Sequence, residues 1–156
     1  MTGRIDARLA ELGIDLPTPP TPAASYVPSV AAGGLLYVSG QVPFDASGAL
    51  IIGKLGADMD VEGGQAAARA CALSLIAQVK AACGGDLDKL RRVVKLTGFV
   101  NGTAEFGDQP KVINGCSDVM VEVFGPEIGS HARSAVGMGS LPFGVAVEVE
   151  GIFDIG

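Results

Sequence analysis

The clearest pattern in the chain lies between Val61 and Cys83, where apolar side chains recur every three or four positions. Such spacing places them along one face of a helix. Asp60 is a suitable N-cap, and the Gly84-Gly85 pair would end the helix after Cys83. The apolar face consists of Ala68, Ala72, Leu75, Val79 and Ala82. Because small residues dominate this face, we expect the helix to lie close against a sheet.

A second helix is predicted to begin after Asp108, with Pro110 in its first turn. Its apolar positions recur at helical spacing from Val112 onward, and the pair Gly125-Pro126 is expected to end it. Two helices are therefore available to cover a sheet.

The first 23 residues have a different pattern. Residues 4–12 predict a short amphipathic helix, closed by Gly13. Pro17–Pro22 should form an extended strut, because proline fixes φ and has no amide hydrogen to donate. We therefore divide the chain into an N-terminal helix and proline-rich strut at 1–23 and a single domain at 24–156.

Short apolar runs bounded by glycine, proline and polar residues predict the strands. They comprise residues 26–28, 35–38, 90–100, 131–138 and 145–153, with a further short piece at 50–52. The order of strands and helices indicates an α+β fold, in which two helices cover one face of a mixed sheet. Since apolar residues are abundant, we expect the other face to be buried by association.

The last two strands carry the most informative side chains. Side chains alternate between the two faces of a strand, so Arg133 shares a face with His131 and Ala135. If residues 139–143 form a hairpin, Arg133 lies opposite Glu148. Such a pair is either a structural ion pair between strands or an arginine that binds the carboxylate of a small substrate, and the residues alone leave both open.

Composition and charge exclude several classes of protein. The chain has 156 residues, 48% of them hydrophobic, and a net charge of −6, which argues against phosphate-neutralising nucleic-acid binding. One histidine and three scattered cysteines predict no metal site, and the thiols fit a reduced cytoplasmic protein. No run approaches the roughly 20 apolar residues of a membrane span, and the charged first dozen residues do not resemble a secretory signal.

Several motifs occur in a familiar order: Tyr37-Val38-Ser39-Gly40-Gln41, Ala132-Arg133-Ser134-Ala135-Val136, Leu141-Pro142 and Val147-Glu148-Val149-Glu150. Over about residues 24–153 they resemble the RidA family, also called YjgF/YER057c/UK114 and historically labelled endoribonuclease L-PSP. The longer N-terminal segment places the chain in a long, divergent branch. The resemblance implies a chorismate mutase-like α+β fold, a mostly antiparallel sheet and a homotrimer with three clefts between subunits.

The resemblance also implies an activity, the hydrolysis of reactive enamine and imine intermediates such as 2-aminoacrylate to 2-keto acids and ammonia. Arg133 would hold the substrate carboxylate, and Glu148 would orient or activate the attacking water. The remaining pocket residues would be Tyr26 from a neighbouring subunit, Ser39, Gly40, Asn114 and Ala135, the last standing where many members carry a cysteine. An imine carbon is already electrophilic, so no metal, cofactor or covalent nucleophile is expected.

Two other functions compete with this hypothesis. A trimeric protein of the same family could bind small carboxylates without turning them over. Ribonuclease activity rests only on the historical label, and the acidic charge and few aromatic residues weigh against it. His131 is expected to be a surface or hydrogen-bonding residue rather than a general base.

Overall fold

The computed structural model describes residues 2–21 and 24–156, and its centre is a five-stranded sheet with strand order β1-β2-β5-β3-β4. The strands are β1 (Ser29–Ala32), β2 (Leu35–Gln41), β3 (Arg92–Asn101), β4 (Ala132–Met138) and β5 (Val147–Asp154). The α-helices are α1 (Arg4–Glu11), α2 (Val61–Ala82) and α3 (Gln109–Gly129), and 3-10 turns occur at Leu87–Lys89 and Pro142–Gly144. The α+β prediction is confirmed.

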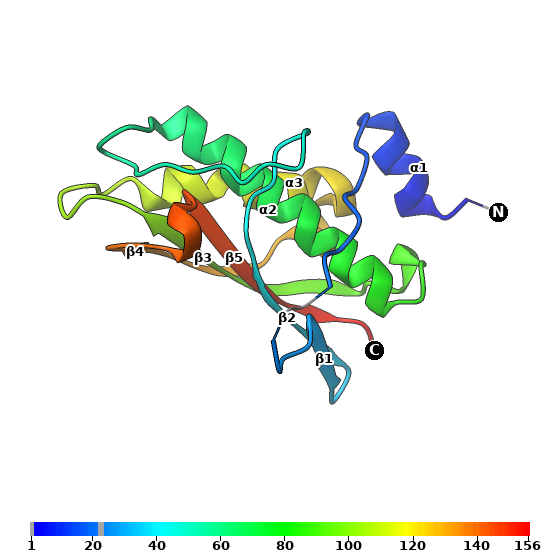
Figure 1. The fold of residues 1–156 in the computed structure, drawn as a ribbon. Coiled ribbons are helices and arrows are strands. Elements are labelled where there is room, and N and C mark those ends of the chain that lie inside the picture. The colour runs from blue at the N-terminus through cyan, green and yellow to red at the C-terminus, as the bar shows by residue number, and fades with distance from the viewer. Residues whose placement is uncertain (1, 22–23) are drawn as a thin grey trace.

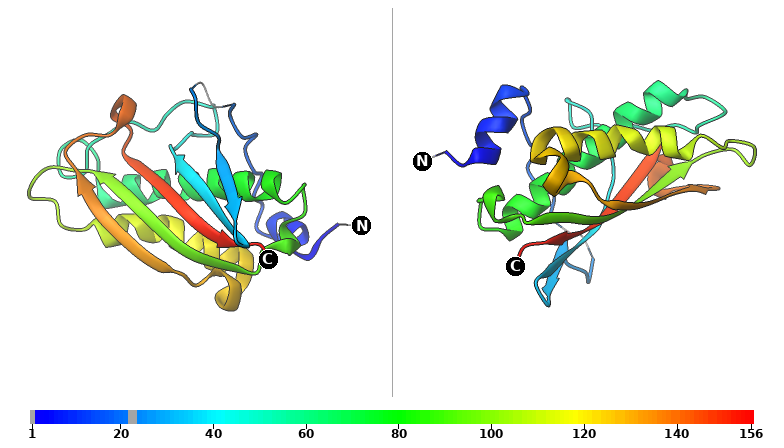
Figure 2. Two further views of the ribbon diagram at one scale, coloured as in Figure 1. Left: turned by 90° about the horizontal axis from the view of Figure 1, so that it is seen from below. Right: turned by 180° about the vertical axis from the view of Figure 1, so that it is seen from behind.

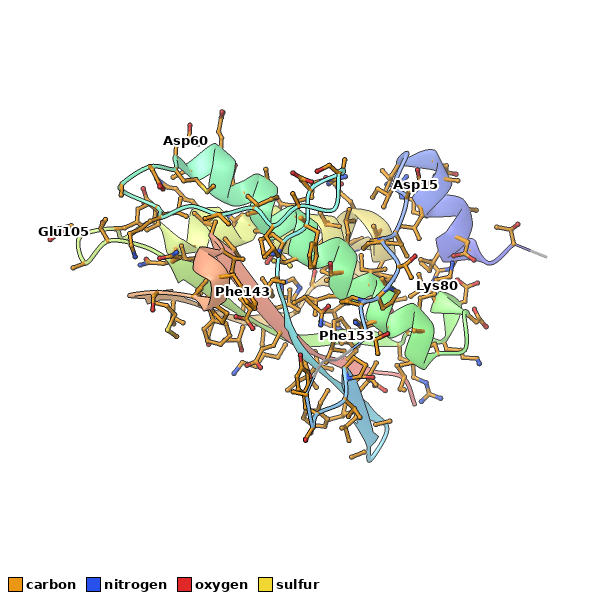
Figure 3. All side chains as sticks on the ribbon, in the orientation of Figure 1. Asp15, Asp60, Lys80, Glu105, Phe143 and Phe153 are labelled. Carbon is orange, nitrogen blue, oxygen red and sulfur yellow. The ribbon has the colours of Figure 1, made fainter. Side chains whose placement is uncertain are left out.

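Helices α2 and α3 lie side by side on one face of the sheet, and the opposite face carries no helix in the described residues (Figures 1 and 2). Asp60 caps α2 as predicted, its carboxylate accepting the Gly63 N–H at 2.7 Å. The layer between helices and sheet is mainly apolar, and Phe153 of β5 is buried in it, whereas Phe143 is 77% exposed (Figure 3). No described helix is long and apolar enough to cross a membrane.

Helix α3 connects two neighbouring parallel strands. β3 runs into α3, and α3 returns the chain to β4, which pairs with β3 in parallel. Gly125 has a φ of 81°, so the regular helix ends at the predicted position, and one further turn follows it. The crossover places β4 at the edge of the sheet, beside α3.

The predicted hairpin between the last two strands is wrong. β5 pairs with β2 and β3, both antiparallel, so β3 lies between β4 and β5. The connection from β4 therefore carries the chain past the end of β3, through the Pro142–Gly144 turn. Side-chain alternation does not reveal this, because it fixes the faces of a strand and not its neighbours.

The first hairpin is present but begins later than predicted. β1 covers residues 29–32 rather than 26–28, and Ala32 pairs with Leu35 across Gly33 and Gly34. Both glycines have positive φ, 60° and 81°, which two-residue hairpin turns require. This tight turn sets the register and so the start of the strand.

The predicted N-terminal helix is confirmed as α1, and it packs on the same core as the rest of the chain. Ile5 and Leu9 are buried, and the Asp88 carboxylate accepts the backbone N–H groups of Arg4 at 2.7 Å and Ile5 at 2.9 Å. The described part of the strut, residues 17–21, has no regular secondary structure, and Pro22 lies outside the described residues. The division of the chain at residue 23 stays a prediction.

Candidate active site

Arg133 lies on edge strand β4 and faces the helices. It pairs with Leu96 of β3, a fully buried residue of the helix-covered face. Its Nη1 donates to Asn114 Oδ1 at 2.8 Å and to Ser117 Oγ at 3.2 Å, both from α3. Within residues 2–21 and 24–156, no carboxylate lies within 4.0 Å of its guanidinium. The arginine is therefore held by neutral oxygen atoms and keeps its charge available.

A second pair of hydrogen bonds supports this arginine. Ser117 Oγ lies 2.9 Å from His131 Nε2, and His131 Nδ1 lies 2.7 Å from the Gly129 carbonyl oxygen. Burial is the main cause that lowers the pKa of His131, and nearby Arg133 also lowers it, although the bond to Gly129 acts in the opposite direction. The imidazole is thus neutral near pH 7, with a hydrogen-bonding role.

Glu148 lies on the other face of the sheet. In β5 it pairs with Phe99 of β3, on the face without helices, and Glu150 follows it on the same face. Burial raises the pKa of Glu148, and the neighbouring Glu150 raises it further. A carboxyl group with a raised pKa is suited to exchanging a proton with substrate or water near neutral pH.

Gly40 makes room for this carboxylate. A Cβ atom on Gly40 would lie 2.1 Å from Glu148 Oε1, so only glycine permits the observed position of the side chain. Ser39, the preceding residue, donates its hydroxyl to the Val27 carbonyl oxygen at 3.0 Å. This bond ties the end of β2 to the segment that contains Tyr26, whose side chain is 58% exposed.

The structure therefore separates the predicted site residues into two groups. The first, the arginine half-site, comprises Arg133, Asn114 and Ala135, which pairs with Gly98 on the helix-covered face. The second, the glutamate half-site, comprises Glu148, Gly40 and the adjacent Ser39, whose hydroxyl is bonded to the segment that contains Tyr26. The expectation that Arg133 faces Glu148 within one chain is wrong, because the two side chains lie on opposite faces of the sheet.

Sequence reasoning missed Ser117 and the role of its contact with His131. The signal was present, because Ser117 follows Asn114 by three residues and so shares its face of α3. It could be interpreted only once β4 was known to lie beside α3.

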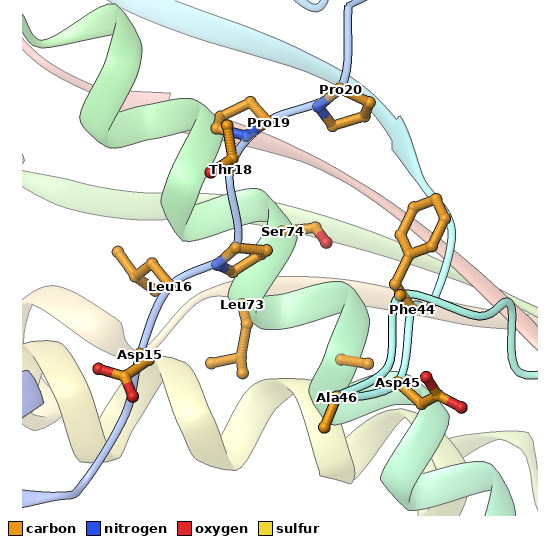
Figure 4. A pocket seen from close by; sticks show the side chains of 13 residues that line it. Asp15, Leu16, Thr18, Pro19, Pro20, Phe44, Asp45, Ala46, Leu73 and Ser74 are labelled. Carbon is orange, nitrogen blue, oxygen red and sulfur yellow. The ribbon is translucent and has the colours of Figure 1, made fainter.

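A cavity of about 710 Å³ lies away from both half-sites. It is lined by residues 15–20, which lead into and include part of the strut, by the turn at 44–48 and by α2 (Figure 4). Its ionisable groups are the carboxyls of Asp15 and Asp45, and Asp45 already accepts hydrogen bonds from Ser47 and Ala49. A cavity without a basic group is not suited to a carboxylate ligand.

The described residues also contain no group of three or more His, Cys, Asp or Glu side chains placed to hold a metal ion.

Comparison with known proteins agrees with the motifs. The family described as "YjgF/chorismate mutase-like, putative endoribonuclease" matches residues 6–149. Protein TCP17 of Trypanosoma cruzi is 51% identical over 154 residues, which are 99% of this chain and 96% of that protein. Among solved structures, Atu1372 of Agrobacterium tumefaciens, a protein of unknown function, is 50% identical to this chain. Its structure aligns with a TM-score of 0.89 over 97% of this chain and 92% of the Atu1372 chain.

A more distant similarity reaches the Rid proteins. YyfA of Yersinia pestis, a protein of unknown function of the Rid family, is 26% identical to this chain. Its structure aligns with a TM-score of 0.62 over 88% of this chain and 94% of the YyfA chain. The match over residues 6–149 spans both half-sites and every strand except the end of β5. The chain therefore belongs to the YjgF/chorismate mutase-like family, the RidA family to which its motifs point.

Proposed function

We propose that this protein is an enamine/imine deaminase, which hydrolyses 2-aminoacrylate-type intermediates to 2-keto acids and ammonia. The observation that carries the proposal is the Arg133 guanidinium, which is anchored by Asn114 and Ser117 and has no carboxylate partner in the described chain. A planar guanidinium matches the two oxygens of a carboxylate, the one charged group that all these substrates share.

The active site in this proposal is shared between subunits of a homotrimer. One chain presents Arg133 and Glu148 on opposite faces of its sheet, so a single subunit cannot direct both at one small substrate. A neighbouring copy can supply the glutamate half-site to the arginine half-site. Large apolar side chains support such an interface, with Tyr37 45% exposed and Val136 40% exposed on the sheet face that lacks helices.

The chemistry needs few groups. Protonation of the terminal carbon of 2-aminoacrylate by solvent gives the iminium ion, and Arg133 holds the carboxylate while water attacks the C2 carbon. Glu148 accepts the proton that the water loses and returns it to the nitrogen of the tetrahedral intermediate. Ammonia then leaves as the hydroxyl group of the intermediate loses its proton to solvent and the keto acid forms, so that one water is consumed for each ammonia released.

The test couples the purified protein to a dehydratase that generates 2-aminoacrylate and follows keto-acid release. We expect release to be faster with the protein than without it, and the Arg133→Ala variant to lose this acceleration. The proposal fails if the protein adds nothing to the spontaneous rate, or if the variant is as active as the wild type. Sedimentation or light scattering tests the trimer separately.

A non-catalytic carboxylate-binding protein is the second candidate. It is favoured by one observation, that the arginine half-site is complete within one chain and does not include Glu148. Calorimetry with 2-oxobutanoate distinguishes the two functions. Binding that depends on Arg133, together with no acceleration of hydrolysis, would establish the second candidate.

A further inference from the structure

The contacts of Arg133 define which of its hydrogen atoms remain for a ligand. A guanidinium carries five N–H donors, two of them on Nη1. Asn114 Oδ1 and Ser117 Oγ both accept from Nη1, at 2.8 and 3.2 Å. The edge formed by Nε and Nη2 therefore keeps its parallel N–H pair, the geometry that binds a carboxylate through both oxygens.

The orientation of the Ser117 hydroxyl is set by His131. The Gly129 carbonyl can only accept, so the 2.7 Å contact requires the hydrogen of the neutral imidazole to be on Nδ1. Nε2 then has a free lone pair and accepts the Ser117 hydroxyl hydrogen at 2.9 Å. With its hydrogen directed at His131, the Ser117 oxygen presents its lone pairs to Arg133.

We infer that Ser117 and His131 are positioning residues for substrate binding, which hold Nη1 so that Arg133 offers its Nε–Nη2 edge to the substrate carboxylate. Without His131, a serine in a helix can turn its hydroxyl to the backbone carbonyl four residues earlier. The oxygen would then leave Nη1, and the guanidinium would keep Asn114 alone. This inference rests on the proposed carboxylate site at Arg133.

The chain allows a matched pair of variants at His131. In His131→Asn, the amide nitrogen can take the place of Nδ1 and keep the Gly129 contact, but the side chain is too short to reach Ser117. In His131→Gln, the amide oxygen can take the place of Nε2 and accept from Ser117. A merely structural role predicts similar effects of both, because both remove the imidazole ring.

Calorimetry with 2-oxobutanoate gives the dissociation constant, and the dehydratase-coupled assay gives kcat and KM. We expect His131→Asn to weaken binding and raise KM by roughly 3–10-fold, the effect of one neutral hydrogen bond, with kcat within about twofold of wild type. His131→Gln should restore both constants to within about twofold. Ser117→Ala should match His131→Asn, and the double variant should be no weaker than Ser117→Ala, because both residues act through one contact.

Controls separate this inference from the proposal on which it rests. Ser130→Ala changes an exposed side chain next to His131 and should bind as wild type. If Arg133→Ala abolishes binding but both His131→Asn and Ser117→Ala bind as wild type, the positioning role is refuted and the carboxylate site stands. Equal losses in His131→Asn and His131→Gln also refute it. If Arg133→Ala binds as well as wild type, the proposed function itself fails.

Discussion

Substitution of Gly40 by alanine tests the position of Glu148 without changing any ionisable group. The added Cβ would lie 2.1 Å from Glu148 Oε1, 3.0 Å from Cδ and 3.2 Å from Cγ. An ordinary contact begins at 3.4 Å, so the carboxylate oxygen must move by about 1.3 Å, the difference between the two distances. Gly40 has no positive φ, and its backbone therefore accepts alanine without strain.

The expected effect is large on activity and small on stability. A displacement of about 1 Å in a catalytic group can lower a rate by roughly 100-fold, and we expect kcat/KM of Gly40→Ala to fall by about this factor. The obstructed atoms belong to the end of a flexible side chain, which can rotate away. Since alanine also restricts the unfolded chain, by about 0.4–1 kcal/mol, the unfolding free energy should stay the same or rise slightly.

The measurement is the dehydratase-coupled assay together with urea unfolding. Gly107→Ala is the matched control, because Gly107 also has no positive φ and nothing lies within 4 Å of its Cβ position. In a Glu148→Ala background, Gly40→Ala should cost no further activity, because the displaced group is already absent. The reasoning is refuted if Gly40→Ala and Gly107→Ala keep equal activity.

Three further variants test other contacts. Gly115→Ala would place a Cβ 2.2 Å from the Gln65 carbonyl oxygen of α2, a backbone atom that cannot rotate away as a side chain can. This variant should lower the unfolding free energy by about 1–3 kcal/mol. An unchanged urea midpoint would contradict this close approach. Asp88→Ala removes the carboxylate that accepts the first N–H groups of α1 and should lower the unfolding free energy by about 0.5–2 kcal/mol. Amide hydrogen exchange in α1 should become faster. Unchanged exchange there would show that this carboxylate does not stabilise the start of α1. Because the pKa of Glu148 is raised in the fold, the folded state holds its proton to higher pH than the unfolded state. Stability is therefore lost as pH rises from the ordinary glutamate range through the raised pKa of the folded state. Glu148→Gln should therefore be stabilising relative to wild type at about pH 7, and this gain should disappear at about pH 3; an equal difference in Tm at both pH values would contradict it.

Much of the local structure could be predicted from particular residues. The spacing of Ala68, Leu75 and Val79, with Asp60 before them, identified α2 almost to the residue. Alternation in the last strands correctly placed Arg133 and Ala135 on one face of β4. These predictions succeeded because helical and strand periodicities depend on neighbours a few residues apart.

The partners of those side chains could not be predicted in the same way. The hairpin hypothesis placed Arg133 against Glu148, but α3 carries the chain back to the outer edge of β3, so β4 and β5 never meet. Asn114 was identified through the family resemblance, and its contact with Arg133 through the structure. Ser117 and the orientation of His131 required α3 and β4 to be side by side.

The sequence by itself determined the helices, the faces of the strands, the family motifs and a positively charged side chain within an apolar strand. Only the tertiary structure decided that this arginine is held by α3 and that Glu148 lies on the other face of the sheet. The physical reason is that periodicity specifies which way a side chain points, whereas its partner depends on the packing of segments far apart in the chain.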